Sequence, residues 1–258
     1  NPLQHQPVAR AVLIGLVLFL AILLAGAVYG LRQSAVRISR VQVFGADASF
    51  AGYATDAIQG SYLGIIPRDS IFFFPESRIR ARILAEHPQF AALSVFREGM
   101  TGISLKFVER VAVVKWCGLS HTEGVDAYCY LVDAGGFLFG AASDSSQFLN
   151  RFTLYAPILG DTLEPLRATI APFEELPHIF DFARQMDALG SPAERITVRS
   201  GEVDIRLSSG TRISYLLGDE QNAFTALVSG RENFNLADGS VEYIDLRFGE
   251  KMYLKRKE

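Results

Sequence analysis

The longest apolar stretch of the chain lies near its N-terminus. Residues 11–31 read AVLIGLVLFLAILLAGAVYGL, carry no charge, and are bracketed by Arg10 and Arg32. At 1.5 Å per residue, a helix of this length crosses a hydrocarbon core of roughly 30 Å. We therefore predict a transmembrane helix at 11–31, preceded by a truncated cytoplasmic tail at 1–10. The alternatives are a cleaved signal peptide, which usually has a shorter apolar core, and a buried core helix, which would lack a polar face here.

Residues 36–110 show shorter, mixed periodicities. Alternating apolar residues indicate strands, as where Ile103, Leu105 and Phe107 share one face, and spacings of three and four indicate helices. Such an order lets both helices cover one face of a small sheet. The predicted elements are a strand at 36–44, helices at 50–59 and 76–87, and strands at 90–96 and 103–108.

The pattern changes again after Arg110, where short strands alternate with turns. Val203, Ile205 and Leu207 alternate with polar residues, and Ser209-Gly210 supplies a turn, which predicts a meander. The whole chain is therefore expected to be α+β, with residues 111–258 forming a mostly antiparallel β domain with two helices. Its predicted elements are short strands at 111–116, 128–133, 137–139 and 152–159, helices at 173–189 and 220–234, a meander at 195–216, and a final strand pair at 241–248 and 251–255.

Composition and motifs narrow the function. The net charge of −3 offers no general attraction for nucleic acid. No nucleophile elbow, zinc-binding helix or phosphate-binding glycine loop occurs, and the histidines (His5, His87, His121 and His178) are scattered. The acidic Asp133 precedes Ala134-Gly135-Gly136, a typical turn. We therefore expect no enzyme, no metal, no cofactor and no small-molecule substrate.

The two cysteines, Cys117 and Cys129, lie 12 positions apart, each beside a predicted strand. Their spacing fits a disulfide across two strands, which would persist outside the reducing cytosol. Two reduced, buried thiols are the main alternative. A zinc site that includes His121 lacks the usual spacing of four ligands.

The orientation in the membrane is not decided by charge. Arg10 precedes the apolar stretch, whereas Arg32, Arg37 and Arg40 follow it, and positive charges usually stay in the cytoplasm. Counted this way, the large domain would be cytoplasmic. The possible disulfide favours the opposite orientation, and large domains translocate largely regardless of charge.

The last strand pair offers the best candidate surface for a partner. Ile244, Leu246 and Phe248 alternate with Tyr243, Asp245 and Arg247. A strand at the end of a chain is often a sheet edge, whose unpaired backbone groups can bind a strand of another protein. The alternative is an ordinary edge that is protected by its charged residues, Lys251, Lys255, Arg256 and Lys257.

The order of motifs resembles the FtsQ/DivIB family of bacterial cell-division proteins across nearly the whole chain. The matching motifs are ISRVQVFG at 38–45, ISLKFVERVA at 103–112, YLVD at 130–133, Gly210 with LG at 217–218, and YIDLR at 243–247. The resemblance implies a POTRA domain at 36–110, an extracytoplasmic β domain at 111–258, and no catalysis. The cysteines and the loop between them depart from the family pattern.

The resemblance also implies a location and partners. The protein would sit in the cytoplasmic (inner) membrane with its N-terminus in the cytoplasm, enriched at the division septum, and bind FtsB-like and FtsL-like division proteins. A different membrane-anchored POTRA protein, acting in protein transport or secretion, is the alternative, and a membrane-tethered enzyme is a third. Carried over by position, the partner-binding residues are Tyr243, Asp245, Arg247, Phe248, Lys251, Met252, Tyr253 and Lys255.

Overall fold

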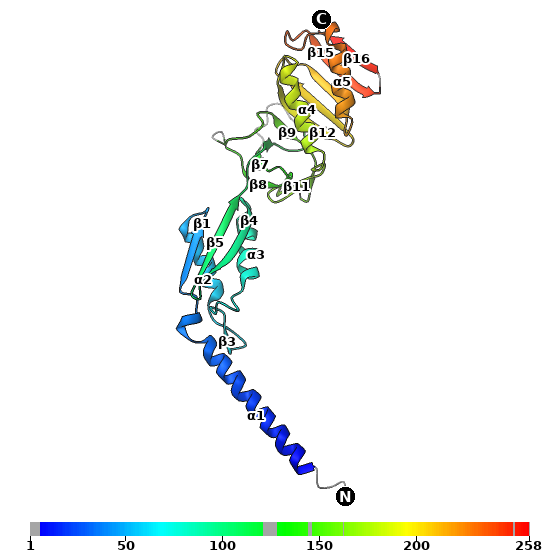
Figure 1. Cartoon of the computed structure of the whole chain (residues 1–258). Coiled ribbons are helices and arrows are strands. Elements are labelled where there is room, and N and C mark those ends of the chain that lie inside the picture. The colour runs from blue at the N-terminus through cyan, green and yellow to red at the C-terminus, as the bar shows by residue number, and fades with distance from the viewer. Residues whose placement is uncertain (1–5, 121–127, 144–145, 162, 250, 258) are drawn as a thin grey trace. The chain divides into compact units, whose positions relative to one another are not determined.

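The computed structural model describes residues 6–120, 128–143, 146–161, 163–249 and 251–257. The chain divides into two units, residues 1–109 and 110–258, each with its own apolar core (Figure 1). Within the described residues the fold is mixed, with five α-helices and one large mixed sheet.

The N-terminal helix α1 (Gln6–Leu31) has 26 residues. Its apolar segment, Arg10–Leu31, is long and apolar enough to cross a membrane, and none of it is buried within the protein. A Cβ added at Gly15, Gly26 or Gly30 would meet no neighbouring atom. The helix therefore exposes its apolar surface on all sides, as expected of a segment that is surrounded by lipid.

The remainder of the first unit is a three-stranded sheet with two helices. In the order β1-β5-β4, β1 pairs with β5 in parallel and β4 pairs with β5 antiparallel. Ile79 and Ile83 of α3 share one buried cluster with Ile103 and Leu105 of β5, and all four are fully buried. The elements are β1 (Arg40–Phe44), α2 (Ala51–Ile58), β2 (Ser61–Tyr62), β3 (Ile66–Pro67), α3 (Glu76–Glu86), β4 (Phe90–Glu98) and β5 (Gly102–Glu109).

The strand expected at 36–44 is shorter in the structure. Ser34–Val36 forms a 3₁₀ turn, and β1 begins only at Arg40. The Ile38 N–H donates to the Asp69 carbonyl over 2.7 Å, and the Ile71 N–H donates to the Val36 carbonyl. Val36 and Ile38, at the start of the predicted strand, therefore hydrogen-bond to the loop before α3 rather than to the sheet.

The second unit contains, among the described residues, a nine-stranded sheet in the order β16-β15-β14-β13-β12-β9-β6-β7-β8. Three pairings, β14 with β15, β9 with β12 and β6 with β9, are parallel, and the other five are antiparallel. The strands are β6 (Val114–Trp116), β7 (Tyr130–Val132), β8 (Leu138–Ala141), β9 (Thr153–Tyr155), β12 (Ala193–Arg199), β13 (Glu202–Leu207), β14 (Arg212–Leu216), β15 (Val241–Phe248) and β16 (Lys251–Arg256), and β10 (Ile158–Leu159) pairs separately with β11 (Thr169–Ile170).

Two helices cover one face of this sheet. The helix α4 (Leu176–Ala188) lies between β9 and β12 in the chain, and α5 (Glu220–Gly230) connects β14 to β15, so each helix joins two parallel strands. They lie side by side (Figure 1), and Phe182 packs on Tyr215 with ring centroids 4.6 Å apart. The opposite face of β12 to β16 carries mainly polar side chains and is called the open face below.

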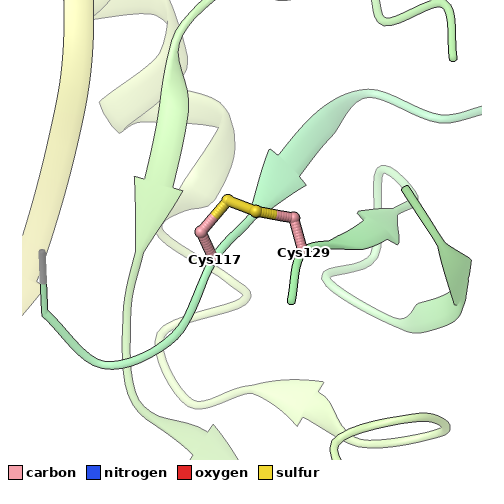
Figure 2. The surroundings of a disulfide bond; sticks show 2 residues. All are labelled: Cys117 and Cys129. Atoms are coloured by element: carbon pink, nitrogen blue, oxygen red, sulfur yellow. A yellow bond between two sulfur atoms is a disulfide. The ribbon is translucent and has the colours of Figure 1, made fainter. Parts of the chain in front are cut away.

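Cys117 and Cys129 are joined in a disulfide (Figure 2). Cys117 follows β6 and Cys129 precedes β7, which are paired antiparallel neighbours. The bond therefore closes the loop between the two strands at its base.

Candidate functional site

The strand β16 forms an open edge of the large sheet. It pairs with β15 on one side, and within the described residues no other segment hydrogen-bonds to the backbone of Lys251–Arg256. At the other edge, the backbone of β8 is engaged at its first residue, because the Leu138 N–H donates to the Ala168 carbonyl and the Leu138 carbonyl accepts from the Arg167 N–H. The open edge is six residues long, about 20 Å at 3.4 Å per residue.

The two faces of β16 differ in chemistry. Met252 and Leu254 turn inward and pack against the core, with Met252 close to Gly230 at the end of α5. Lys251, Tyr253 and Lys255 are exposed. Of the residues that the resemblance selects on this strand, Met252 can therefore offer a partner its backbone but little of its side chain.

The neighbouring strand β15 is not an edge. It is paired with β16 on one side and, through Tyr243–Asp245, with β14 on the other, so it lies inside the sheet. Tyr243, Asp245 and Arg247 place their side chains on the open face, opposite to the buried Ile244 and Leu246. The sequence-predicted residues of β15 can thus contribute side-chain contacts, whereas backbone pairing belongs to β16.

Arg247 links two strands through carboxylates. Its Nε donates to Asp245 Oδ1 over 2.9 Å, its Nη2 to Asp245 Oδ2 over 2.6 Å, and its Nη1 to Glu202 Oε2 of β13 over 2.9 Å. The hydrogen bonds that Asp245 accepts from Arg247 lower the pKa of Asp245. The hydrogen bonds to Asp245, and to a lesser extent the one to Glu202, raise the pKa of Arg247. The arrangement fixes both side chains on the open face.

An aromatic pair stands at the turn of the β15–β16 hairpin. The rings of Phe248 and Tyr253 meet edge to face with centroids 5.2 Å apart. Both remain exposed, 58% for Phe248 and 49% for Tyr253. Exposed aromatic side chains of this kind are typical anchors of protein interfaces.

A row of cationic side chains crosses the open face next to this hairpin. Strand register places Arg195 opposite Arg206, Arg206 opposite Arg212, Arg212 opposite Tyr243, and Tyr243 opposite Lys255. The Arg212 guanidinium lies over the Tyr243 ring at 5.6 Å. Among the described residues, Arg195 and Arg206 make no ion pair. The three arginines line a depression of about 400 Å³.

Sequence reasoning did not find this arginine row. The three residues lie in separate strands, and nothing in a single strand shows which residues of the next strand stand opposite. The only sequence signal is that each arginine occupies a polar position of an alternating strand, which also describes ordinary solvent-facing positions. Like charges directly opposite one another destabilise a sheet, so the row is a costly feature of the fold.

The other candidates from the sequence have structural roles. Asp133 Oδ1 accepts from the N–H groups of Gly135 and Phe137, which confirms the predicted turn, and its carboxylate pairs with Arg110. His87 is half-buried, with its Nε2 2.8 Å from the Tyr53 hydroxyl. His5 and His121 lie outside the described residues. Among the residues that the structure describes, no group of three or more His, Cys, Asp or Glu side chains could hold a metal ion.

The geometry thus combines one free strand edge, two exposed aromatic rings and an adjacent cationic row. A search with models of known protein families finds no match to the chain, and a search of curated proteins finds none either.

Proposed function

We propose that this chain is a membrane-anchored scaffold of the bacterial cell-division machinery, similar to FtsQ/DivIB, which binds an FtsB-like partner by strand addition to β16. The single observation that carries the proposal is the free edge of β16, along which no described segment pairs with the backbone of Lys251–Arg256. An added strand would complete the hydrogen bonds of this edge and extend the sheet by one strand.

The rest of the chain supports the same proposal. The helix α1 is long and apolar enough to serve as the anchor. The order β1, α2, α3, β4, β5, with β1 parallel to β5, is compatible with a POTRA-like first unit. The Cys117–Cys129 disulfide supports an extracytoplasmic second unit, because disulfides persist in oxidising compartments.

The open face specifies the chemistry of the partner. The open face carries positive charge that starts with Lys255 on the edge strand, which pairs with Glu242 at 2.7 Å, and continues inward through Arg212, Arg206 and Arg195 on β14, β13 and β12. The exposed rings of Phe248 and Tyr253 add apolar contact area. We therefore propose a partner segment that is extended along β16 and carries acidic and apolar side chains toward the open face.

The binding test uses the full chain in detergent micelles and a synthetic segment of an FtsB-like partner. The double substitution Phe248→Ala and Tyr253→Ala should weaken binding at least tenfold, about 1.4 kcal/mol, because it removes the aromatic contacts beside the edge. Tyr128→Ala is the matched control, since Tyr128 is 91% exposed in the same unit but precedes β7, far from β16 in the sheet order.

Two results would contradict the proposal. One is equal loss of binding in the Tyr128→Ala control. The other is undiminished binding by a chain that lacks residues 239–258 and therefore both strands of the hairpin. A fluorescent fusion in dividing cells separates the transport alternative, because a division scaffold should concentrate at mid-cell only when residues 239–258 are present.

A further inference from the structure

The β2–β3 hairpin of the first unit exposes an apolar tip. Leu63 is 96% exposed, the highest value among the exposed large apolar side chains of the described chain, and the neighbouring Ile65 is 52% exposed. The turn is closed by a hydrogen bond from the Ile65 N–H to the Tyr62 carbonyl over 3.0 Å. Leu63 has a φ of +50°, a left-handed conformation that is unfavourable for leucine. In water, both its exposure and its backbone conformation would be unfavourable.

The hairpin lies beside the C-terminal end of α1 (Figure 1). Arg32, the residue after α1, donates from its Nη2 to the carbonyl oxygens of Gly64 at 3.3 Å and Ile65 at 3.4 Å. The tip of the hairpin is therefore within the reach of one side chain from the end of the apolar helix.

Two further exposed apolar side chains lie at the same end of the first unit. Phe72 and Phe73 are each about half exposed, and they follow Ser70, which forms a bridge with Arg37. Phe74, the next residue, lies under the guanidinium of Arg97, which stands opposite Ile103 at the start of β5. This is also the end of the sheet at which β1 begins, since Arg40 pairs with Gly102, and β1 is the first strand after α1.

The length of α1 determines where the hairpin end of the first unit lies relative to the bilayer. Residues 11–31 span about 32 Å as a helix, close to the roughly 30 Å of a hydrocarbon core. If Ala11 lies at one boundary, Leu31 lies at the other, and the Arg32 guanidinium reaches the headgroup layer. The hairpin tip that accepts its hydrogen bonds must lie at the same depth. Tyr62, whose ring is under Arg68 at 5.2 Å, has the amphipathic character typical of this layer.

We propose that the β2–β3 hairpin inserts Leu63 and Ile65 into the interfacial layer of the bilayer, with Phe72 and Phe73 resting on the same layer. This inference rests on the proposed membrane anchoring by α1 and adds a second, non-spanning attachment. Insertion would bury Leu63 in lipid and offset its unfavourable conformation. Two points of attachment would limit how far the first unit tilts over the membrane.

The test places one fluorescent label at a time on the full chain in vesicles of phosphatidylcholine and phosphatidylglycerol. Leu63→Cys reports the hairpin tip, Leu20→Cys reports the middle of α1, and Gln89→Cys is the matched exposed control. Gln89 precedes Phe90, which pairs with Glu109 at the end of the sheet remote from Gly102. The added thiol reacts alone, because the two natural cysteines are joined. Vesicles then contain a lipid-borne quencher located just below the headgroups.

We expect strong quenching at position 63, weak quenching at position 89, and at least a threefold difference between them. Quenching at position 20 by a quencher placed near the bilayer centre shows that α1 is inserted. If position 20 is not quenched, the membrane anchor itself is wrong, and this inference falls with it. If position 20 is quenched but 63 is no more quenched than 89, the anchor stands and the hairpin inference is overturned.

A second variant separates insertion from mere proximity. Leu63→Asp, combined with the label at Ile65→Cys, should reduce quenching at position 65 several-fold, because a carboxylate resists entry into the apolar layer. Leu63→Met, which keeps the apolar character without adding a β-branch at this left-handed position, should leave quenching at position 65 nearly unchanged. Equal quenching in the aspartate and methionine variants would overturn the inference.

Discussion

Arg206 stands between two other arginines, Arg195 on β12 and Arg212 on β14, and faces both directly across the strands. Like charges in this position destabilise a sheet, so Arg206→Glu should replace two repulsions by two attractions. We expect the free energy of unfolding to rise by about 0.5–1 kcal/mol, and the gain to shrink at high salt. Urea unfolding of the full chain in detergent, followed by the fluorescence of Trp116, measures this change.

Arg199→Glu is the matched control on the same face. Arg199 donates to Asp204 of the next strand over 2.5 Å, so its reversal should destabilise the sheet. If both charge reversals lower stability equally, the arginine row is not repulsive. A stabilising Arg206→Glu that also weakens partner binding would identify the row as a feature retained for binding at a cost in stability.

Asp245 provides a pH-dependent contribution at the same scale. Hydrogen bonds from Arg247 lower its pKa in the folded state, below the value of about 3.9 that it has when unfolded. The resulting stability is present above the unfolded pKa and is lost as the pH falls through the folded pKa. Asp245→Asn should therefore be less stable than the natural chain at pH 7, and the gap in urea midpoints should narrow at about pH 3. Asp187→Asn, at an exposed carboxylate without an ion pair among the described residues, is the matched control.

At the scale of elements, periodicity predicted what the longer segments form. The helix α4 has 13 residues and the strands β12, β13 and β14 have seven, six and five, long enough for the pattern to separate helix from strand. The two-residue strands β2, β3, β10 and β11 were not separately predicted as strands, because such short segments have no measurable period.

Pairing between elements was not predictable in the same way. The parallel pairs of β9 with β12 and β14 with β15 depend on the path of the intervening helices, which a local pattern does not contain. The edge position of β16 followed from its place at the chain end, a general tendency rather than a pattern in its residues. The arginine row needed the register of several strands and therefore required coordinates.

The pairing of β6 with β7 rests partly on the disulfide at its base. Each strand has only three residues, and Cys117–Cys129 closes the 12-residue separation between the two cysteines. Removing this closure enlarges the conformational freedom of the unfolded chain, so Cys117→Ala with Cys129→Ala should lower the free energy of unfolding by about 3 kcal/mol. Trp116 fluorescence during urea unfolding measures the loss, and the natural chain under reducing conditions should show a similar one. An unchanged midpoint in both cases would mean that the bond does not contribute to stability.

At the scale of the whole molecule, the two units have separate cores. Ile103 is fully buried in the first core and Ile205 is fully buried in the second. Each substitution to alanine should lower the stability of its own unit by about 2–5 kcal/mol, since it removes buried methyl groups and leaves a cavity. Unfolding should then proceed as two transitions rather than one.

The single tryptophan makes this separation measurable. Trp116 is buried in the second unit, where its Nε1–H donates to the Ala156 carbonyl over 2.9 Å, so its fluorescence reports that unit alone. Ile205→Ala should lower the urea midpoint of this signal, whereas Ile103→Ala should leave it unchanged and instead accelerate amide hydrogen exchange in β4 and β5. A fall in the Trp116 midpoint caused by Ile103→Ala would show that the units unfold together. Independent unfolding would mean that the free edge of β16, the proposed binding site, persists whatever the state of the first unit, because the second core alone supports it.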